Sequence, residues 1–274
     1  MKNNSSSIKS NSSVTQIRFK ASIHRHLNFN THIMKTFIAK AFAFLFIATL
    51  TTSCMIDGIS SVTGNRNVVT ESRKINNDFT KIEVGQGIQL YITQSNDLSL
   101  VVKADENLHD LIRTEVRNGV LKISSKKSIR RAKSKKIYLS APNIYGIKAT
   151  SGSGVVTENT ITAAVFEAHV SSGADARIDV NADTVNSSSS SGADLRIKGR
   201  ANYYTAKATS GSSIRAYGLE SKNADVKVNS GADIDVYVTE SLTAKATSGG
   251  DIDYRGNPKK VDKKKNSGGS ISSN

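Results

Sequence analysis

The sequence has little of the material from which enzymes usually build a bulky core. Among 274 residues there are two prolines, no tryptophan and one cysteine, and aromatic residues make up 6%. Because Cys54 is the single cysteine, no disulfide can form within the chain, and a zinc site would lack further thiolate ligands. Serine, glycine, alanine and β-branched residues dominate instead. This composition is not typical of an enzyme with a bulky core.

Acidic residues are missing from the first 53 positions, which carry seven lysines and arginines and account for nearly half of the formal net charge of +15. Within this stretch Met34 opens a short basic segment, followed by an apolar run from Ala41 to Leu50 and then small polar residues. The apolar run is too short for a comfortable transmembrane helix and is typical of a secretion signal.

The signal ends at the cysteine. The residues Leu50-Thr51-Thr52-Ser53-Cys54 resemble the lipobox of bacterial lipoproteins, which implies that Cys54 becomes the acylated first residue of the mature chain. We therefore predict a signal peptide at 34–53, lipidation at Cys54 and a linker at 54–78. Residues 1–33 are either a wrongly assigned upstream start or a disordered arm. Acyl chains would anchor the protein to a membrane of the cell envelope, with the outer membrane as the expected site.

A serine–glycine pair returns at a steady interval along the second half of the chain. The intervals are 18 to 21 residues, and the pairs are Ser151-Gly152, Ser172-Gly173, Ser191-Gly192, Ser210-Gly211, Ser230-Gly231, Ser248-Gly249 and Ser267-Gly268. Counted from each glycine, the third residue before it and the third and fifth after it are mostly apolar, whereas even positions are mostly polar. This alternation is that of a β-strand with one buried face.

A strand pattern that repeats about every 19 residues predicts stacked coils, each about 4.8 Å from the next around a narrow core. We predict an all-β fold over 79–256: a parallel β-solenoid with coils of about 19–20 residues, preceded by amphipathic strands. Residues 257–274 are either a basic tail or a last coil. We expect the glycine to allow a sharp corner with positive φ. We also expect the serine before it to point inward, so that the serines form a ladder of stacked hydroxyls.

Four stretches of the sequence resemble the head GIN domain family of auto-transporter adhesins, which are bacterial envelope proteins. They are FTKIEVGQGIQLYITQ at 79–94, APNIYGIKATSGSGVV at 141–156, SGAD beginning at Ser172, Ser191 and Ser230, and YRGNPKKVDKKKNSGGSI at 254–271. The resemblance covers roughly 79–272. It implies a right-handed parallel β-helix with an adhesin-like function, and it brings no catalytic residues with it.

Aspartates recur two residues after the turn glycines. Asp175, Asp194, Asp233 and Asp251 are expected to form an outward ladder, interrupted at Ser213. Carboxylates about 4.8 Å apart repel each other by roughly 1 kcal/mol or less per pair in water, so solvent, neighbouring arginines or a cation must relieve them. A solvated face is one interpretation, and a calcium or glycan site is the other. The ligand-dense pattern of a calcium loop is absent, so no metal site or cofactor is predicted.

The highest density of charged residues lies in a segment that contains no acidic residue. Its cations are Lys126, Lys127, Arg130, Arg131, Lys133, Lys135 and Lys136. The segment is interpreted either as a solvated hairpin loop or as a contact with anionic lipid headgroups, lipopolysaccharide or acidic glycan, because basic residues near an anionic surface are attracted to it. Nucleic acid is not expected, since the run lacks interleaved aromatics for base stacking.

Taken together, these features predict an envelope lipoprotein that is not an enzyme. Its solenoid would present a polar face for adhesion or binding, with a glycan or another cell-surface ligand as partner; the oligomeric state is not predicted. The alternative is a carbohydrate-active β-helix enzyme, a polysaccharide lyase or glycosidase. In that case the pairs Asp233/Asp235 and Asp251/Asp253 are the best-placed carboxylates.

Overall fold

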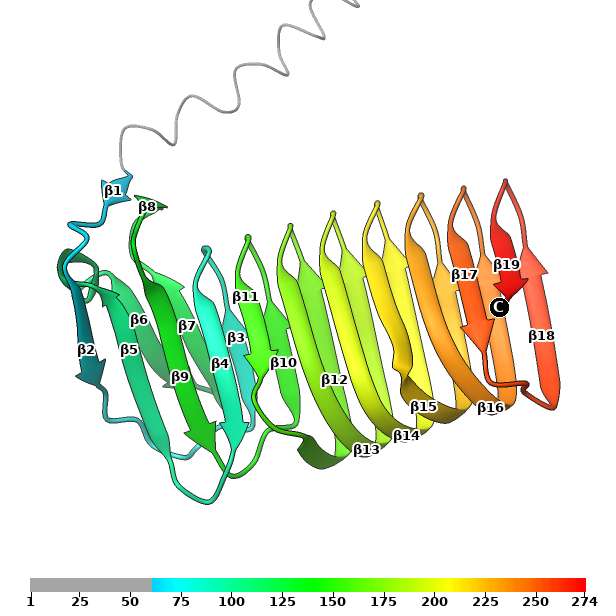
Figure 1. The fold of residues 1–274 in the computed structure, drawn as a ribbon, viewed down its shortest axis with the longest axis horizontal. Helices are drawn as coiled ribbons and strands as arrows, with labels where there is room; N and C mark the ends of the chain where they lie inside the picture. Colours follow the sequence, from blue (N-terminus) through cyan, green and yellow to red (C-terminus); the bar gives the residue numbers. More distant parts are fainter. Residues whose placement is uncertain (1–60) are drawn as a thin grey trace, which may run out of the picture. The chain divides into compact units, whose positions relative to one another are not determined.

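Parallel β-strands build nearly all of the structure. The computed structural model describes residues 61–274, and the predictions for 1–33, for the signal peptide and for Cys54 lie outside the described residues. This part of the chain is all-β apart from a short 3₁₀ turn, η2 (Glu106–Leu108), and its coils stack along one axis (Figure 1). The predicted fold class is therefore confirmed. Within 61–274 there is no helix of the length and apolarity needed to cross a membrane.

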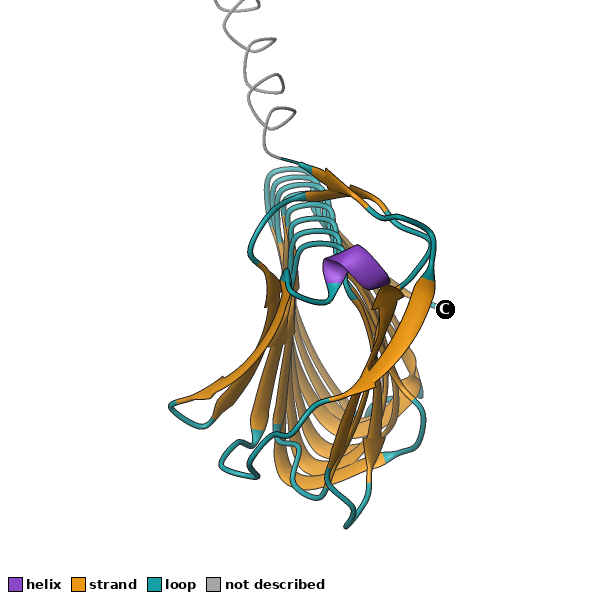
Figure 2. Ribbon diagram, turned by 90° about the vertical axis from the view of Figure 1, so that its left-hand side faces the viewer, coloured by secondary structure: helices purple, strands orange, loops and turns teal. Residues whose placement is uncertain are grey.

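Each coil contributes to two facing layers, which we call face A and face B. In the middle of the molecule one long, bent strand makes a whole coil, with its first half on face A and its second half on face B (Figure 2). These strands are β13 (Asp175–Ser190), β14 (Asp194–Thr209), β15 (Ser213–Val228) and β16 (Asp233–Ala246).

The remaining strands extend the two faces in both directions. Besides the first halves of β13–β16, face A holds β2 (Val68–Ser72), β5 (Ser99–Asp105), β9 (Lys135–Ala141), β4 (Gln89–Gln94), β11 (Gly154–Thr157), β17 (Asp251–Arg255) and β19 (Ser270–Ser273). Besides the second halves, face B holds β6 (Ile112–Arg117), β7 (Val120–Ser125), β3 (Lys81–Val84), β10 (Gly146–Ala149), β12 (Ile161–Ser171) and β18 (Lys260–Lys265).

The serine–glycine pairs are two-residue turns where face B passes into face A. Both residues of a pair have positive φ, for example 55° for Ser191 and 68° for Gly192. The amide of the next residue, Ala193, donates to the carbonyl of Ser190 at 3.3 Å. Positive φ at both central positions is the signature of a type I′ turn. The predicted positive φ at glycine is confirmed, and the serine shares that conformation.

The predicted inward ladder of serine hydroxyls is wrong. The turn serines are exposed, because both central residues of the turn lie outside the in-and-out alternation of the strands. The residue after the glycine points inward instead, and it is small in Ser153, Ala174, Ala193, Ser212, Ala232 and Gly250. A Cβ on Gly250 would lie 3.0 Å from the methyl carbons of Val228. The narrow corner therefore selects small residues one position later than the sequence suggested.

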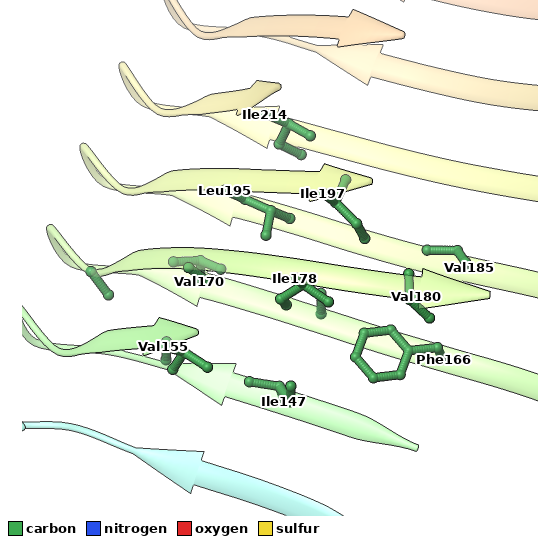
Figure 3. Packing of buried hydrophobic residues seen from close by; sticks show 14 of the residues in the cluster. Ile147, Val155, Phe166, Val170, Ile178, Val180, Val185, Leu195, Ile197 and Ile214 are labelled. Carbon is green, nitrogen blue, oxygen red and sulfur yellow. The ribbon is translucent and has the colours of Figure 1, made fainter. Parts of the chain in front are cut away.

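Apolar residues at odd positions from the turn glycine form the core, as predicted. Val155, Ala176 and Leu195 are directly paired in neighbouring coils and are at most 1% exposed. Figure 3 shows Val155, Ile178, Leu195 and Ile197 pointing into the space between the two faces. Residues 61–274 share one continuous apolar cluster and form one compact unit, which indicates that this part of the chain can fold by itself.

The first coils contain an insertion that the repeat did not predict. β3 and β4 are joined by the turn Gln86–Gly87, with φ of 58° and 69°, and the Gly87 amide donates to the carbonyl of Ser151 at 3.0 Å. This turn therefore stacks directly on the Ser151 turn, although residues 95–143 lie between the two coils in sequence. Within the insertion, β7 pairs with β3 and β9 pairs with β4, so these two strands form a further coil.

One predicted boundary differs from the structure, and one open alternative is decided by it. Residues 54–78 were expected as a linker, but they include β1 (Val62–Thr63) and β2, which pair with β8 (Ile129–Arg131) and β5. Residues 257–274 form a last coil, the second of the two predicted alternatives, in which the Ser267–Gly268 turn connects β18 and β19.

The turn geometry predicts how substitutions at Ser191 will affect stability. A β-branched residue fits poorly at positive φ, whereas asparagine tolerates that conformation. Ser191→Val should lower the free energy of unfolding of residues 61–274 by about 1–2 kcal/mol, and Ser191→Asn should leave it nearly unchanged. Urea unfolding of the two variants would measure this. A larger loss of unfolding free energy in Ser191→Asn than in Ser191→Val would indicate an inward-facing serine and contradict the turn assignment.

Candidate binding surfaces

The predicted aspartate ladder lies on face A. Asp175 pairs with Asp194, Asp194 pairs with Ser213, and the row continues through Asp233 to Asp251. The strand register thus places all four predicted carboxylates in one row, interrupted at Ser213 as expected. All of them are at least partly exposed.

A second row of face A, two residues further along each strand, is chemically richer. In spatial order it contains Tyr138, Tyr91, Val156, Arg177, Arg196, Arg215, Asp235 and Asp253. The rings of Tyr138 and Tyr91 are stacked, with centroids 5.0 Å apart and planes 15° from parallel. The row therefore passes from aromatic to aliphatic, cationic and finally anionic side chains, one coil at a time.

The arginines of this row are paired with acids of the first row. Arg215 Nη1 lies 2.5 Å from Asp194 Oδ2, while Arg196 Nε lies 3.8 Å from Asp194 Oδ1 and Arg177 Nε 3.7 Å from Asp175 Oδ1. The two longer pairs are too loose for hydrogen bonds, so both guanidinium groups keep donors for another partner.

A groove of about 490 Å³ lies over the middle of the second row on face A, from Val156 to Arg215. Its walls are lined by Val156, Thr157, Glu158, Asn159, Arg177, Ile178, Asp179, Arg196, Ile197, Lys198, Arg215, Tyr217 and Gly218. Lys198 Nζ lies 3.2 Å from Asp179 Oδ2 within the groove, and the arginines of the groove lie near aspartates of the first row beside it, so these charges are largely balanced. Tyr217 belongs to an irregular stretch of β15, where the pairing with β16 shifts between Ala216 and Glu220. The groove offers hydrogen-bond donors and acceptors beside apolar stems, without a strong net charge.

Four carboxylates gather where the two rows reach the last coils. Asp233 pairs with Asp251, and Asp235 pairs with Asp253. Burial and the negative charge of Asp253 raise the pKa of Asp235, and burial and the charge of Asp251 raise the pKa of Asp253. Within the described part of the chain, no group of three or more His, Cys, Asp or Glu side chains is arranged to hold a metal ion.

The predicted basic segment is an expanded turn. β7 ends at Ser125 on face B and β9 begins at Lys135 on face A, so residues 126–134 stand where later coils have a two-residue turn. Lys126, Lys127, Arg130, Arg131 and Lys133 lie in this expanded turn and are exposed. None of the predicted cations forms an ion pair with any residue of 61–274.

The last two predicted cations lie apart from the others, at the start of β9. Lys136 Nζ lies 5.7 Å from the ring centroid of Tyr91 on face A. Lys135 is half-buried, and burial lowers its pKa. The structure thus separates five cations of the expanded turn from Lys135 and Lys136, which belong to β9.

A buried carboxylate holds the expanded turn in place. Asp105 is 0% exposed and accepts hydrogen bonds from the backbone amides of Arg66 at 3.0 Å, Lys133 at 3.1 Å and Ser134 at 2.9 Å. Burial acts to raise the pKa of Asp105, but these hydrogen bonds outweigh it and the pKa is lowered. Asp105 therefore stays ionised and ties the start of the described chain to the basic segment.

Sequence reasoning missed the aromatic end of the second row. Tyr91 and Tyr138 belong to coils that lack a serine–glycine pair, so the repeat did not include them. One signal was present: Gln86–Gly87 is followed by Leu90 and Ile92 at the same offsets at which apolar residues follow the later turn glycines. Aligning on glycine alone would have placed Tyr91 in the arginine row.

The carboxylate cluster predicts that Asp235→Asn stabilises the folded state by an amount that depends on pH. Because the pKa of Asp235 is raised on folding, its ionised form destabilises the folded state, and this penalty disappears as the pH falls through the raised pKa. Asp235→Asn should raise the free energy of unfolding at pH 7 by about 1 kcal/mol or less. The gain should shrink toward pH 4. Thermal unfolding across this range would measure it.

Asp179→Asn is the matched control, since Asp179 is paired with Lys198 and should give no gain. A loss of stability in Asp235→Asn at pH 7 would show that its carboxylate is stabilising, contrary to the prediction.

Solved structures with the same fold come from species of Bacteroides and Parabacteroides. A "putative adhesin" from Bacteroides fragilis aligns with a TM-score of 0.74 and 24% identity over 78% of this chain and 100% of its own. A "putative adhesin" from Parabacteroides distasonis has a TM-score of 0.66, 22% identity and coverage of 78% and 100%. A "putative lipid binding protein" from the same species has a TM-score of 0.65, 21% identity and coverage of 78% and 99%. At these identities the likeness concerns the fold. Comparison with curated proteins gave no match.

Residues 78–258 match the family described as "Putative auto-transporter adhesin, head GIN domain". This range includes the rows of face A, the groove and the expanded turn, and it agrees with the family predicted from the sequence motifs. The protein therefore belongs to the head GIN domain family.

Proposed function

We propose that this protein is a non-catalytic lipoprotein of the cell envelope whose solenoid binds a cell-surface glycan through face A. The observation that carries the proposal is the in-register row that runs from the stacked Tyr138 and Tyr91 through Val156 to the arginines, beside a groove of about 490 Å³. Family membership supports a binding or adhesion role at the cell surface.

The chemistry of the groove suits a sugar chain. A sugar ring has an apolar face that packs on aromatic side chains, and hydroxyls that need both donors and acceptors. Face A supplies rings at Tyr91 and Tyr138 and loosely paired guanidinium groups at Arg177 and Arg196, with carboxylates close by. Because the strand rows repeat every ~4.8 Å, they form an extended track rather than a closed pocket. An extended track fits a polymer better than a small molecule.

Attachment to the membrane is the second part of the proposal. The signal-like segment 34–53 and the lipobox-like ending at Cys54 support acylation of that cysteine. An acylated Cys54 would hold the solenoid at a membrane of the envelope, with the outer membrane as the proposed site. Detection of an acyl chain on the peptide that begins at Cys54 by mass spectrometry would test this part.

Glycan-array binding by residues 61–274 tests the binding surface. Arg196→Ser combined with Tyr91→Ala should weaken binding of the recognised glycan at least tenfold, because an aromatic contact and an Arg hydrogen bond are each worth about 1 kcal/mol or more. The control is Lys207→Ser combined with Lys227→Ser, which changes exposed residues of face B. Equal affinity of the groove variant and the wild type would rule out face A as the glycan site.

An enzyme is the alternative function, and one observation favours it. The raised pKa of Asp235 and Asp253 is a property of general acids, and both carboxylates lie on the same face as the groove. We expect no turnover when the protein is incubated with a panel of polysaccharides. Hydrolase or lyase activity that is lost in Asp233→Asn or Asp251→Asn would overturn the non-catalytic proposal.

A further inference from the structure

The expanded turn is a strongly cationic surface. Its five cations, Lys126, Lys127, Arg130, Arg131 and Lys133, are exposed, and none of them forms an ion pair with a residue of 61–274. By contrast, Arg177, Arg196 and Arg215 of the second row on face A each have an aspartate within 4 Å. Like charges gathered without acids repel each other, so an anionic partner would stabilise this surface.

Hydrogen bonds hold the backbone of the expanded turn on both sides. β8 pairs in parallel with β1, and the amides of Val62 and Gly64 donate to the carbonyls of Ser128 at 2.8 Å and Arg131 at 2.7 Å. On the other side, the Lys126 amide donates to the carbonyl of Leu111 at 2.9 Å. Together with the carboxylate of Asp105, these bonds fix the backbone from which the cations project.

Pairing with β1 also places the cations next to the point where the described chain begins. Residue 61 follows Cys54 by only a few positions, and an extended chain spans at most about 3.6 Å per residue. Resting on the proposed acylation of Cys54, this limits the distance from the membrane attachment to residue 61 to roughly 25 Å. Since Val62 contacts the expanded turn directly, the cations are held near the bilayer surface.

We infer that the expanded turn docks on anionic lipid headgroups of the membrane that carries the protein. An electrostatic contact of this kind acts over a Debye length of about 10 Å at 0.1 M salt, so a nearby tether makes it effective. The position at the tethered end distinguishes this partner from a glycan on another surface. The contact orients the solenoid, because the acyl chains restrict only one point whereas the cations restrict a surface.

Vesicle sedimentation with residues 61–274 tests the headgroup contact without the acyl chains. The protein should bind vesicles that contain phosphatidylglycerol and should not bind vesicles of phosphatidylcholine alone. Replacing Lys126, Lys127, Arg130 and Arg131 by serine should weaken binding by roughly 500- to 1,000-fold, since each basic residue near an anionic surface contributes about fivefold. Raising the salt concentration to about 0.5 M should release the wild type, because the Debye length then falls below about 5 Å.

The matched control removes four cations elsewhere. Lys207, Lys227, Lys245 and Lys264 form an exposed row on face B, and their replacement by serine changes the net charge equally. This variant should retain binding to within a few fold, and an unchanged thermal unfolding curve should confirm that both variants are folded. The inference is overturned by an equal loss in the control, by unaltered binding of the turn variant, or by the absence of wild-type binding.

A competition experiment distinguishes binding to a lipid surface from binding to an acidic polymer. Soluble alginate at matched charge should displace the protein only weakly, whereas tighter binding of alginate than of vesicles would assign the turn to acidic glycans and overturn the headgroup assignment. Acylation of Cys54 is measured independently by mass spectrometry. Failure of the lipoprotein proposal and failure of the headgroup contact are therefore distinguishable.

Discussion

The hydrogen bonds between successive turns determine the organisation of the whole solenoid. From Gly87 to Gly249, the amide of each turn glycine donates to the carbonyl of the first turn residue of the neighbouring coil, as Gly173 does to Ser191 at 3.1 Å and Gly192 to Ser210 at 3.2 Å. A one-residue slip would exchange the buried and exposed side chains of a strand. By fixing every coil at the same point, the turns keep the apolar positions inside and the polar positions outside. The positive φ of serine costs about 1 kcal/mol or more at each turn, and the supporting coils on both sides offset that cost.

The alignment of the turns also determines which exposed side chains become neighbours in the outer rows. Once the turns are aligned, residues at equal distances from the glycine become neighbours about 4.8 Å apart, even when many residues separate them in sequence. Tyr91 and Val156 are paired across the inserted segment for this reason. A binding track can therefore be assembled from single residues in separate coils, each of which changes the surface without changing the core.

The sequence predicted the parts of this structure that depend on periodicity. The coil length, the buried columns, the aspartate row and the family all follow from repeated local patterns. The inward serine ladder failed because alternation was extended through a turn in which both central residues leave the strand conformation. The coil formed by β7 and β9 and the strands β1 and β2 depend on pairing between distant segments, which no local pattern contains. The aromatic end of the second row was missed because the repeat was aligned on serine–glycine pairs, which the coils of Tyr91 and Tyr138 lack.

The expanded turn shows why one edge of a solenoid can change without affecting the faces. A two-residue turn and the turn at 126–134 both connect a strand of face B to a strand of face A, so the pairing of the neighbouring coils is the same for either. The added residues then project from the turn edge, where they displace no core side chain. They need only a local anchor, which Asp105 provides by binding the amides of Lys133 and Ser134. The proposed membrane contact at the edge and the proposed ligand contact on face A thus involve different residues, and each surface can vary in sequence while the other is kept.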